Sequence, residues 1–166
     1  MFTPILATLG YVFSPDRRRV LLVHRSARPG DAHLGKYNGL GGKLEPDEDI
    51  VSGMRRELRE EAAIDATDLH LAGTISWPGF GKNGEDWFGF LFRILAFTGS
   101  PLDHNAEGTL QWHDLDRVFE LPLWDGDRYF LPRIFDFQSQ PFHGVMPYQG
   151  GQALNWQFSC LPLLTV

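Results

Sequence analysis

Cysteine, long apolar runs and positive charge are all scarce in this sequence, and each shortage excludes a class of protein. Cys160 is the single cysteine among 166 residues, so the chain cannot form an internal disulfide and is not a disulfide-stapled secreted scaffold. Neither a run of about 18 apolar residues nor a charged and then apolar leader is present, which predicts no membrane span and no signal peptide. The expected location is therefore the cytoplasm.

The charge balance is acidic. Lysine and arginine together number 15, against 21 aspartates and glutamates, for a net charge of -6. Proteins that bind nucleic-acid polymers concentrate Lys and Arg on one face, so we expect no such partner. Free nucleotides remain compatible as substrates, because bound metal ions can supply the positive charge.

Length and composition indicate one globular unit. Hydrophobic residues make up 43% of the chain and charged residues 22%, which excludes a disordered protein. A chain of 166 residues buries one sizeable core but is short for two domains. We therefore expect residues 1–166 to form a single domain, as a monomer or a homodimer.

The most informative stretch is residues 42–64, GKLEPDEDIVSGMRRELREEAAI. It places acidic, basic and apolar side chains at fixed spacings across a loop and an expected helix over residues 47–62, since Pro46 and Asp47 favour a helix start. The spaced positions are Gly42, Glu48, Arg56, Glu57, Leu58, Glu60, Glu61 and Ile64. At 3.6 residues per turn the helix has an apolar stripe, made of Ile50, Val51, Met54, Leu58 and Ala62.

The carboxylates of Glu57, Glu60 and Glu61 are expected to converge beside this stripe. Their repulsion is costly unless a cation lies among them, and such an oxygen-rich cluster suits Mg²⁺ or Mn²⁺. The simpler alternative is a solvated amphipathic helix whose charges form i,i+4 pairs, for example Arg56 with Glu60. A spacing match of more than twenty residues over both loop and helix favours the metal site.

This pattern resembles the Nudix box, G-x5-E-x7-R-E-U-x-E-E-x-G-U with U apolar, at every position except one. Ala63 stands where the family has glycine. That glycine suits a left-handed cap at the end of the helix, so alanine implies either strain of about 1 kcal/mol or a helix that ends differently. The resemblance implies an α/β fold, the Nudix fold, with a mixed β-sheet sandwiched between α-helices.

Residue patterns elsewhere agree with such a fold. Apolar, β-prone runs predict strands over residues 5–13, 20–24, 71–77, 87–97 and 110–112. A helical turn over residues 114–119 and a helix over residues 126–137, kinked or begun by Pro132, are expected next. Residues 142–163 are expected to form a terminal hairpin around Gly150 and Gly151.

The resemblance also implies roles at the metal site. The ligands would be the backbone carbonyl of Gly41 and the carboxylates of Glu57, Glu60, Glu61 and Glu107. Arg56 would orient a box glutamate, with Glu48 as its partner. Glu60 is our first choice for the general base and Glu107 our second; the alternative for Glu107 is a solvated loop glutamate.

Outside the box, the chain resembles the 8-oxo-dGTP diphosphatase branch of the family. The segments that carry this likeness are residues 36–43, 123–132, 142–144 and 148–150. Asn38 resembles a residue that binds the purine edge, and Trp124 one that stacks on the base; a turn asparagine and a core tryptophan are the alternatives. We assign substrate binding to Thr8, Arg25, Asn38, Leu40, Gly41, Gly42, Lys43, Trp124 and Asp127.

Asp127 resembles one of two neighbouring pocket aspartates, and Gly126 replaces the other. The pair is thought to distinguish oxidised purines through a carboxyl that its neighbour keeps protonated. With one acid missing, we expect that shift to lose its nearest source. Discrimination between oxidised and ordinary guanine is therefore expected to be weaker.

The resemblance implies Mg²⁺-dependent hydrolysis of a nucleoside triphosphate, such as 8-oxo-dGTP, to a monophosphate and pyrophosphate. Mn²⁺ is a possible substitute for the metal. The rival substrates are ordinary nucleoside triphosphates, ADP-ribose and the triphosphate end of RNA, which the negative charge disfavours. A catalytically silent nucleotide-binding regulator is a further alternative, although the complete set of glutamates argues against it.

Overall fold

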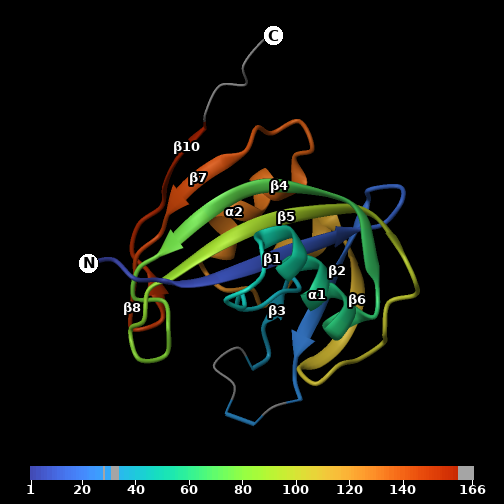
Figure 1. Cartoon of the computed structure of the whole chain (residues 1–166), viewed down its shortest axis with the longest axis horizontal. Coiled ribbons are helices and arrows are strands. Elements are labelled where there is room, and N and C mark those ends of the chain that lie inside the picture. Colours follow the sequence, from blue (N-terminus) through green and yellow to red (C-terminus); the bar gives the residue numbers. More distant parts are fainter. Residues whose placement is uncertain (28, 31–33, 161–166) are drawn as a thin grey trace.

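A large mixed β-sheet forms the centre of the molecule, in a computed structural model that describes residues 1–27, 29–30 and 34–160 (Figure 1). Among these residues its eight strands are β1 (Ile5–Phe13), β2 (Arg19–Arg25), β3 (Tyr37–Asn38), β4 (Asp65–Trp77), β5 (Trp87–Thr98), β6 (Gly108–Asp114), β7 (Phe142–Val145) and β10 (Gln157–Cys160). Their order is β10-β7-β4-β5-β1-β2-β3, and β6 also pairs with β2. The central strand β1 runs parallel to β5 and antiparallel to β2.

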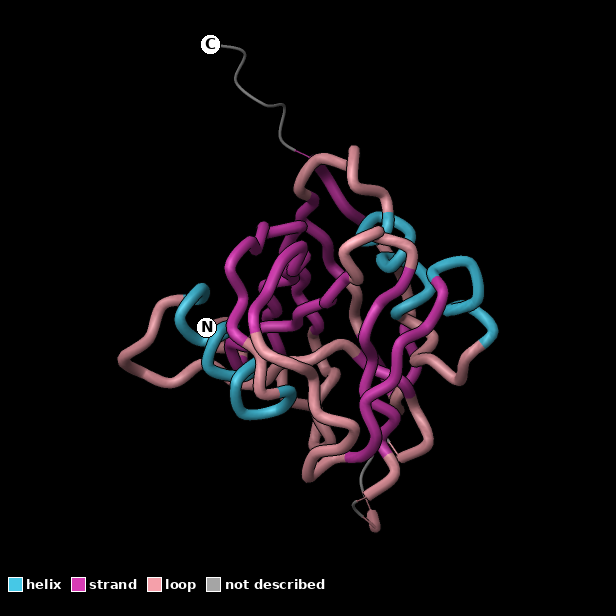
Figure 2. Tube along the Cα trace, turned by 90° about the vertical axis from the view of Figure 1, so that its right-hand side faces the viewer, coloured by secondary structure: helices cyan, strands magenta, loops and turns pink. Residues whose placement is uncertain are grey.

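The two faces of the sheet pack against different helices, α1 (Ile50–Ala62) and α2 (Asp127–Phe135). Successive side chains of a strand point to opposite faces. In β1, Tyr11 and Phe13 pack in the cluster that includes α2, and Val12 packs in the cluster that includes α1. Figure 2 shows the strands between helical segments on either side. The predicted mixed sheet between helices is confirmed.

The first helix, α1, begins at Ile50, three residues later than the sequence predicted. The Asp49 carboxylate accepts hydrogen bonds from the backbone amides of Val51 and Ser52, at 2.7 and 3.1 Å. Asp49 is therefore the N-cap, and Asp47 lies in the preceding turn. Of the predicted apolar stripe, Met54, Leu58 and Ala62 are buried, whereas the Val51 side chain is exposed to solvent.

Other predicted elements are present with shifted ends. Strand β4 begins at Asp65 instead of residue 71, because it pairs with β5 almost along its whole length. The expected helical turn is the 3-10 helix η1 (Leu115–Glu120), and Pro132 lies inside α2 without starting it. Among the described residues, no helix is long and apolar enough to cross a membrane.

The predicted C-terminal hairpin is present in two parts. Strands β7 and β10 pair antiparallel, and between them the short strands β8 (Tyr148–Gln149) and β9 (Gln152–Ala153) turn at Gly150 and Gly151. Leu163, the predicted end of the hairpin, lies outside the described residues.

A buried arginine fixes the end of α2 to the sheet. Arg93 of β5 donates hydrogen bonds to the carbonyls of Ile134, Arg133 and Asp136, at 2.8, 2.6 and 3.0 Å. The last carbonyls of a helix have no partner within the helix, so these bonds both satisfy them and orient α2. Asp127, the first residue of α2, is positioned by the same packing.

Ala63 ends α1 in the left-handed conformation, with φ 56° and ψ 35°. Its backbone amide donates to the Arg59 carbonyl at 3.0 Å, which closes the last turn. Of the two alternatives for this departure from the motif, the structure therefore has the strained one. An L-residue with a side chain is disfavoured at such a φ.

We expect Ala63→Gly to raise the free energy of unfolding by about 1 kcal/mol, because glycine adopts this backbone conformation without a steric cost. Urea unfolding followed by circular dichroism measures the change. Ala62→Gly is the matched control, since Ala62 is buried inside the helix and the same substitution there should lower stability. A loss of stability in both variants would mean that Ala63 is not strained.

Candidate active site

The loop between β3 and α1 lies directly against β1. The Thr8 amide donates to the Gly42 carbonyl at 2.8 Å, and Gly10 and Leu40 exchange backbone hydrogen bonds of 2.6 and 2.9 Å. Gly41 has φ 147°, and a Cβ on it would lie 2.2 Å from the Thr8 carbonyl oxygen. Only glycine permits this approach. It brings the loop backbone beside the edge of α1 that carries Glu57, Glu60 and Glu61, which we call the acidic edge.

Arg56 ties together the carboxylates at this edge. Its guanidinium donates to Glu48 from Nε at 3.0 Å and from Nη2 at 2.6 Å, and to the Lys43 carbonyl at 3.1 Å. Its Nη1 donates to Glu57 at 2.8 Å and to Glu60 at 3.3 Å. The predicted Arg56–Glu48 contact is therefore present, and so is the i,i+4 pair with Glu60. Arg56 is placed to orient glutamates of the box.

Two of the box glutamates are held where negative charge is unfavourable. Burial raises the pKa of Glu57, against the opposing effect of Arg56. Burial and the nearby Glu107 carboxylate raise the pKa of Glu61 to about 8, although Glu61 accepts a hydrogen bond of 2.9 Å from the Gly41 amide. A cation at this edge would relieve the unfavourable charge.

Glu107 reaches the same edge from a different part of the chain. It forms an ion pair with Arg25, and the backbone amide of Glu107 donates to the Asn105 side-chain oxygen at 2.8 Å. The Asn105 amide group in turn donates to the Glu61 carbonyl at 3.1 Å. Asn105 thus fastens this loop to α1, a role that the sequence did not suggest. Glu107 is not the solvated loop glutamate of the alternative interpretation.

The donor set suits a hard divalent cation. Carboxylate oxygens are the ligands that Mg²⁺ and Mn²⁺ prefer, and Glu57 and Glu107 are both close enough to Glu61 for their charges to raise its pKa. Within the described ranges, no three His, Cys, Asp or Glu side chains are already arranged to coordinate one metal ion. Arg56, Arg25 and the Gly41 amide hold these carboxylates instead.

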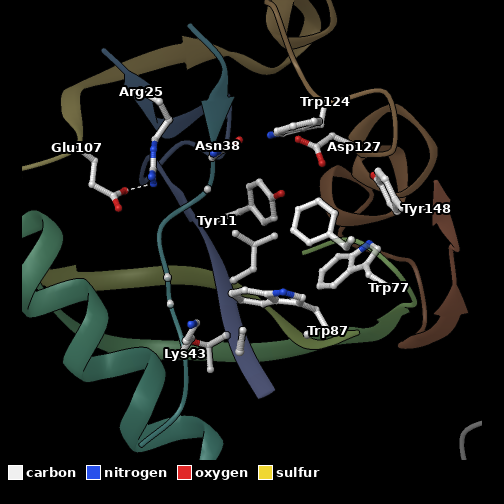
Figure 3. Close-up of a pocket in the computed structure, with 18 residues that line it drawn as sticks. Tyr11, Arg25, Asn38, Lys43, Trp77, Trp87, Glu107, Trp124, Asp127 and Tyr148 are labelled. Carbon is white, nitrogen blue, oxygen red and sulfur yellow. Dashed lines mark hydrogen bonds and ion pairs between the residues drawn. The ribbon is translucent and has the colours of Figure 1, made fainter. Parts of the chain in front are cut away.

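A cavity of about 300 Å³ opens next to this edge (Figure 3). Figure 3 shows Trp124, Asp127 and Tyr148 together on one side of it, while Arg25, Glu107 and Lys43 lie nearer α1. The predicted substrate-binding residues that line the cavity are Thr8, Arg25, Asn38, Gly41, Gly42, Lys43, Trp124 and Asp127. The sequence therefore identified residues that come together from β1, β2, β3 and α2.

Leu40 is the exception among the predicted binding residues. Its side chain is fully buried and packs in the core cluster that contains Met54 and Leu58 of α1. Its backbone pairs with Gly10 as in a strand, which turns the Leu40 side chain into the core. The Leu40 side chain therefore does not line the cavity, and the assignment of the residue to substrate binding stays a prediction.

Asp127 is a carboxyl with an altered proton affinity. Burial raises its pKa to about 7, although Lys36 and Arg128 act in the opposite direction. The neighbouring acid that we expected to be lost is absent, but burial raises the pKa of Asp127 without it. The weaker discrimination between oxidised and ordinary guanine stays a prediction.

Two tyrosines beside Asp127 were missed from the sequence. Tyr11 and Tyr148 both line the cavity, and the pKa of each hydroxyl is raised by burial and by the nearby Asp127 carboxyl. Tyr148 lies in a segment that carried the family likeness, which was the available hint. Both hydroxyls stay protonated at neutral pH.

Comparison with known proteins agrees with this geometry. A family model described as the NUDIX domain matches residues 3–134, so the chain belongs to the Nudix family and is a Nudix hydrolase. It is 34% identical over 150 residues to the zebrafish (Danio rerio) oxidized purine nucleoside triphosphate hydrolase, with 90% of each chain covered. The mouse (Mus musculus) protein of the same name is also 34% identical, over 149 residues, with 90% of each chain covered.

A solved structure shows the same architecture. The crystal structure of a mutator MutT protein from Bacillus halodurans superposes with a TM-score of 0.81 at 26% identity, covering 95% of this chain and 99% of that one. The predicted family and fold are confirmed.

Asp127→Asn should alter how stability depends on pH. The folded pKa of about 7 lies above the usual unfolded value of about 3.9. The wild-type protein therefore loses stability through this group as pH rises from about 4 through 7, whereas asparagine does not titrate. The melting temperature of Asp127→Asn relative to wild type should rise across this window. Asp125→Asn, at an exposed neighbouring position, is the control, and parallel curves for both variants would refute the assignment.

Proposed function

We propose that this Nudix hydrolase cleaves purine nucleoside triphosphates, oxidised purines such as 8-oxo-dGTP among them, in a reaction that depends on Mg²⁺. The products are a nucleoside monophosphate and pyrophosphate. One observation carries the proposal: an aromatic cavity lies beside the acidic edge of α1. At that edge the pKa of Glu61 is raised to about 8.

The cavity suits a purine base in composition. Trp77, Phe80 and Trp124 line it, and flat rings of this kind stack on nucleobases. Asn38 offers both a donor and an acceptor to the base edge, and Asp127 adds a carboxyl. The base would therefore lie on the side that holds Trp124 and Asp127 in Figure 3.

The phosphates would then extend toward α1. Lys43 and Arg25 lie on that side of the cavity and supply positive charge. Thr8 has a buried hydroxyl with no hydrogen-bond partner among the described residues, which suits a contact with the sugar or phosphate chain. A nucleotide in this orientation places its phosphates beside Glu57 and Glu61.

The glutamates differ in how tightly the chain holds them. Glu57 and Glu61 are enclosed and suit metal binding, with Gly41 adjacent. The Glu60 side chain is 59% exposed, and its one ion pair within the described part of the chain is the 3.3 Å contact with Arg56. It is free to accept the proton of an attacking water, whereas Arg25 restrains Glu107. A bound divalent cation would neutralise phosphate charge and lower the pKa of that water.

The names of two relatives favour an oxidised purine as the substrate. The zebrafish and mouse relatives are named for that activity, and this chain keeps the polar and aromatic groups described above.

We further propose that it acts as a single domain in the cytoplasm on free nucleotides, as a monomer or a homodimer. Turnover of 8-oxo-dGTP beside dGTP, dCTP and ADP-ribose with Mg²⁺ tests the choice of substrate.

Glu60→Gln should lower kcat by at least about 10²-fold while the protein stays folded, because the amide cannot accept the proton. Steady-state kinetics with Mg²⁺ measure the loss, and excess EDTA should abolish wild-type turnover. Glu120→Gln, at an exposed position on η1, is the matched control and should retain full activity. Undiminished wild-type hydrolysis in EDTA, or an active Glu60→Gln variant, would remove the basis of this mechanism.

Pyrophosphate should be the main inorganic product, because attack is proposed to fall between the α and β phosphorus atoms. Chromatography of the reaction with a purine triphosphate should therefore show the monophosphate and little diphosphate. A nucleoside diphosphate with orthophosphate as the main products would count decisively against the proposed position of the triphosphate chain.

A further inference from the structure

Gly126 has no room for a side chain. A Cβ on it would lie 2.1 Å from the Tyr148 hydroxyl oxygen and 2.5 Å from the Met146 sulfur. Its backbone has φ -63° and ψ -31°, a conformation that any residue adopts. Glycine is therefore required by the neighbouring side chains, Tyr148 first and Met146 second, and not by the backbone. The hydroxyl of Tyr148 fills the space that a side chain next to Asp127 would need.

Tyr148 is held firmly in this position. It belongs to β8, its backbone amide donates to the Pro78 carbonyl at 2.8 Å, and its ring meets Phe80 edge to face at 5.0 Å. The residue is only 7% exposed. A side chain that is buried and bonded on several sides cannot move away without disturbing the packing.

The hydroxyl keeps its proton at neutral pH, and Tyr148 lies on the side of the cavity that holds Trp124 and Asp127. Burial and the Asp127 carboxyl raise the pKa of Tyr148, and a backbone hydrogen bond from Gly126 opposes this effect. The protonated hydroxyl lies directly against Gly126 and carries one O–H donor that a ligand in the cavity can accept. Tyr148 and Asp127 line the same cavity as Trp124.

We propose that Tyr148 is a specificity-determining residue that donates a hydrogen bond to a carbonyl on the purine edge, beside Asp127. It takes the place of a second acid at position 126 and favours guanine-type triphosphates, which present a 6-oxo group, over adenine-type triphosphates, which present an amino group. This inference rests on the proposed function and deepens it. An ionised carboxylate at that place could only accept, whereas the tyrosine hydroxyl can donate at neutral pH without a protonated neighbour.

Tyr148→Phe tests the donor by removing one oxygen atom. We expect kcat/KM for dGTP and 8-oxo-dGTP to fall about 10- to 100-fold, the usual loss when a polar edge is left unpaired. The loss should appear mainly in KM, while values for dATP and dCTP change less than about threefold. Tyr129→Phe is the matched control, because Tyr129 lies on α2 and is exposed; it should leave all four substrates unchanged.

A second pair of variants tests the shared space without relying on activity. Gly126→Ala should lower the melting temperature strongly, since its methyl group collides with the hydroxyl. In the Tyr148→Phe background the same substitution should cost clearly less, so that the two changes are not additive. Equal costs in both backgrounds would overturn the claim that the hydroxyl fills this space.

The outcomes separate this inference from the proposed function. Wild-type protein that hydrolyses no purine triphosphate would overturn both. Active wild-type protein whose preference for guanine over adenine survives in Tyr148→Phe would overturn the role of Tyr148 alone. A selective loss on the guanine substrates, with Tyr129→Phe unaffected, supports it.

Discussion

The crowding of negative charge on one edge of α1 is the constraint on which the rest of the site depends. Glu57 and Glu61 are enclosed by protein, and enclosed carboxylates are unfavourable unless cations or hydrogen-bond donors face them. Arg56 faces Glu57 and Glu60, the Gly41 amide faces Glu61, and Arg25 faces Glu107. A divalent cation with a bound phosphate would relieve the same charge, so a nucleotide and a metal are expected to bind together.

The sheet joins this edge to the proposed base-binding side. α1 and α2 pack on opposite faces of the sheet, and the loop that follows β3 lies along β1 between them, where Gly41 permits the close approach. The cavity is lined by strands, loops and the first residue of α2, while the acidic edge belongs to α1. The acidic and aromatic ends of the proposed nucleotide site are thus held by different layers of the fold.

The sequence predicted those features that depend on spacing along the chain. The box residues lie on one helix edge because their intervals match the helical repeat, and the core strands follow apolar runs. Sequence patterns were insufficient where distant segments decide the outcome. Asp49 caps α1 in place of Asp47, Leu40 turns into the core, and Tyr148 reaches Gly126 only because β8 folds back beside α2. The pKa of Asp127 likewise depends on burial, which no local pattern reveals.

Mn²⁺ binding followed by electron paramagnetic resonance tests most directly whether the acidic edge and the cavity act as one site. The free Mn²⁺ signal would be titrated with wild-type protein and with Glu61→Gln, with and without a non-hydrolysable purine triphosphate analogue. We expect wild-type protein to bind Mn²⁺, the analogue to tighten that binding at least about tenfold, and Glu61→Gln to weaken both effects. Wild-type protein that binds no Mn²⁺, and that with the analogue lowers the signal of free Mn²⁺ no further than the analogue alone, would contradict the shared site.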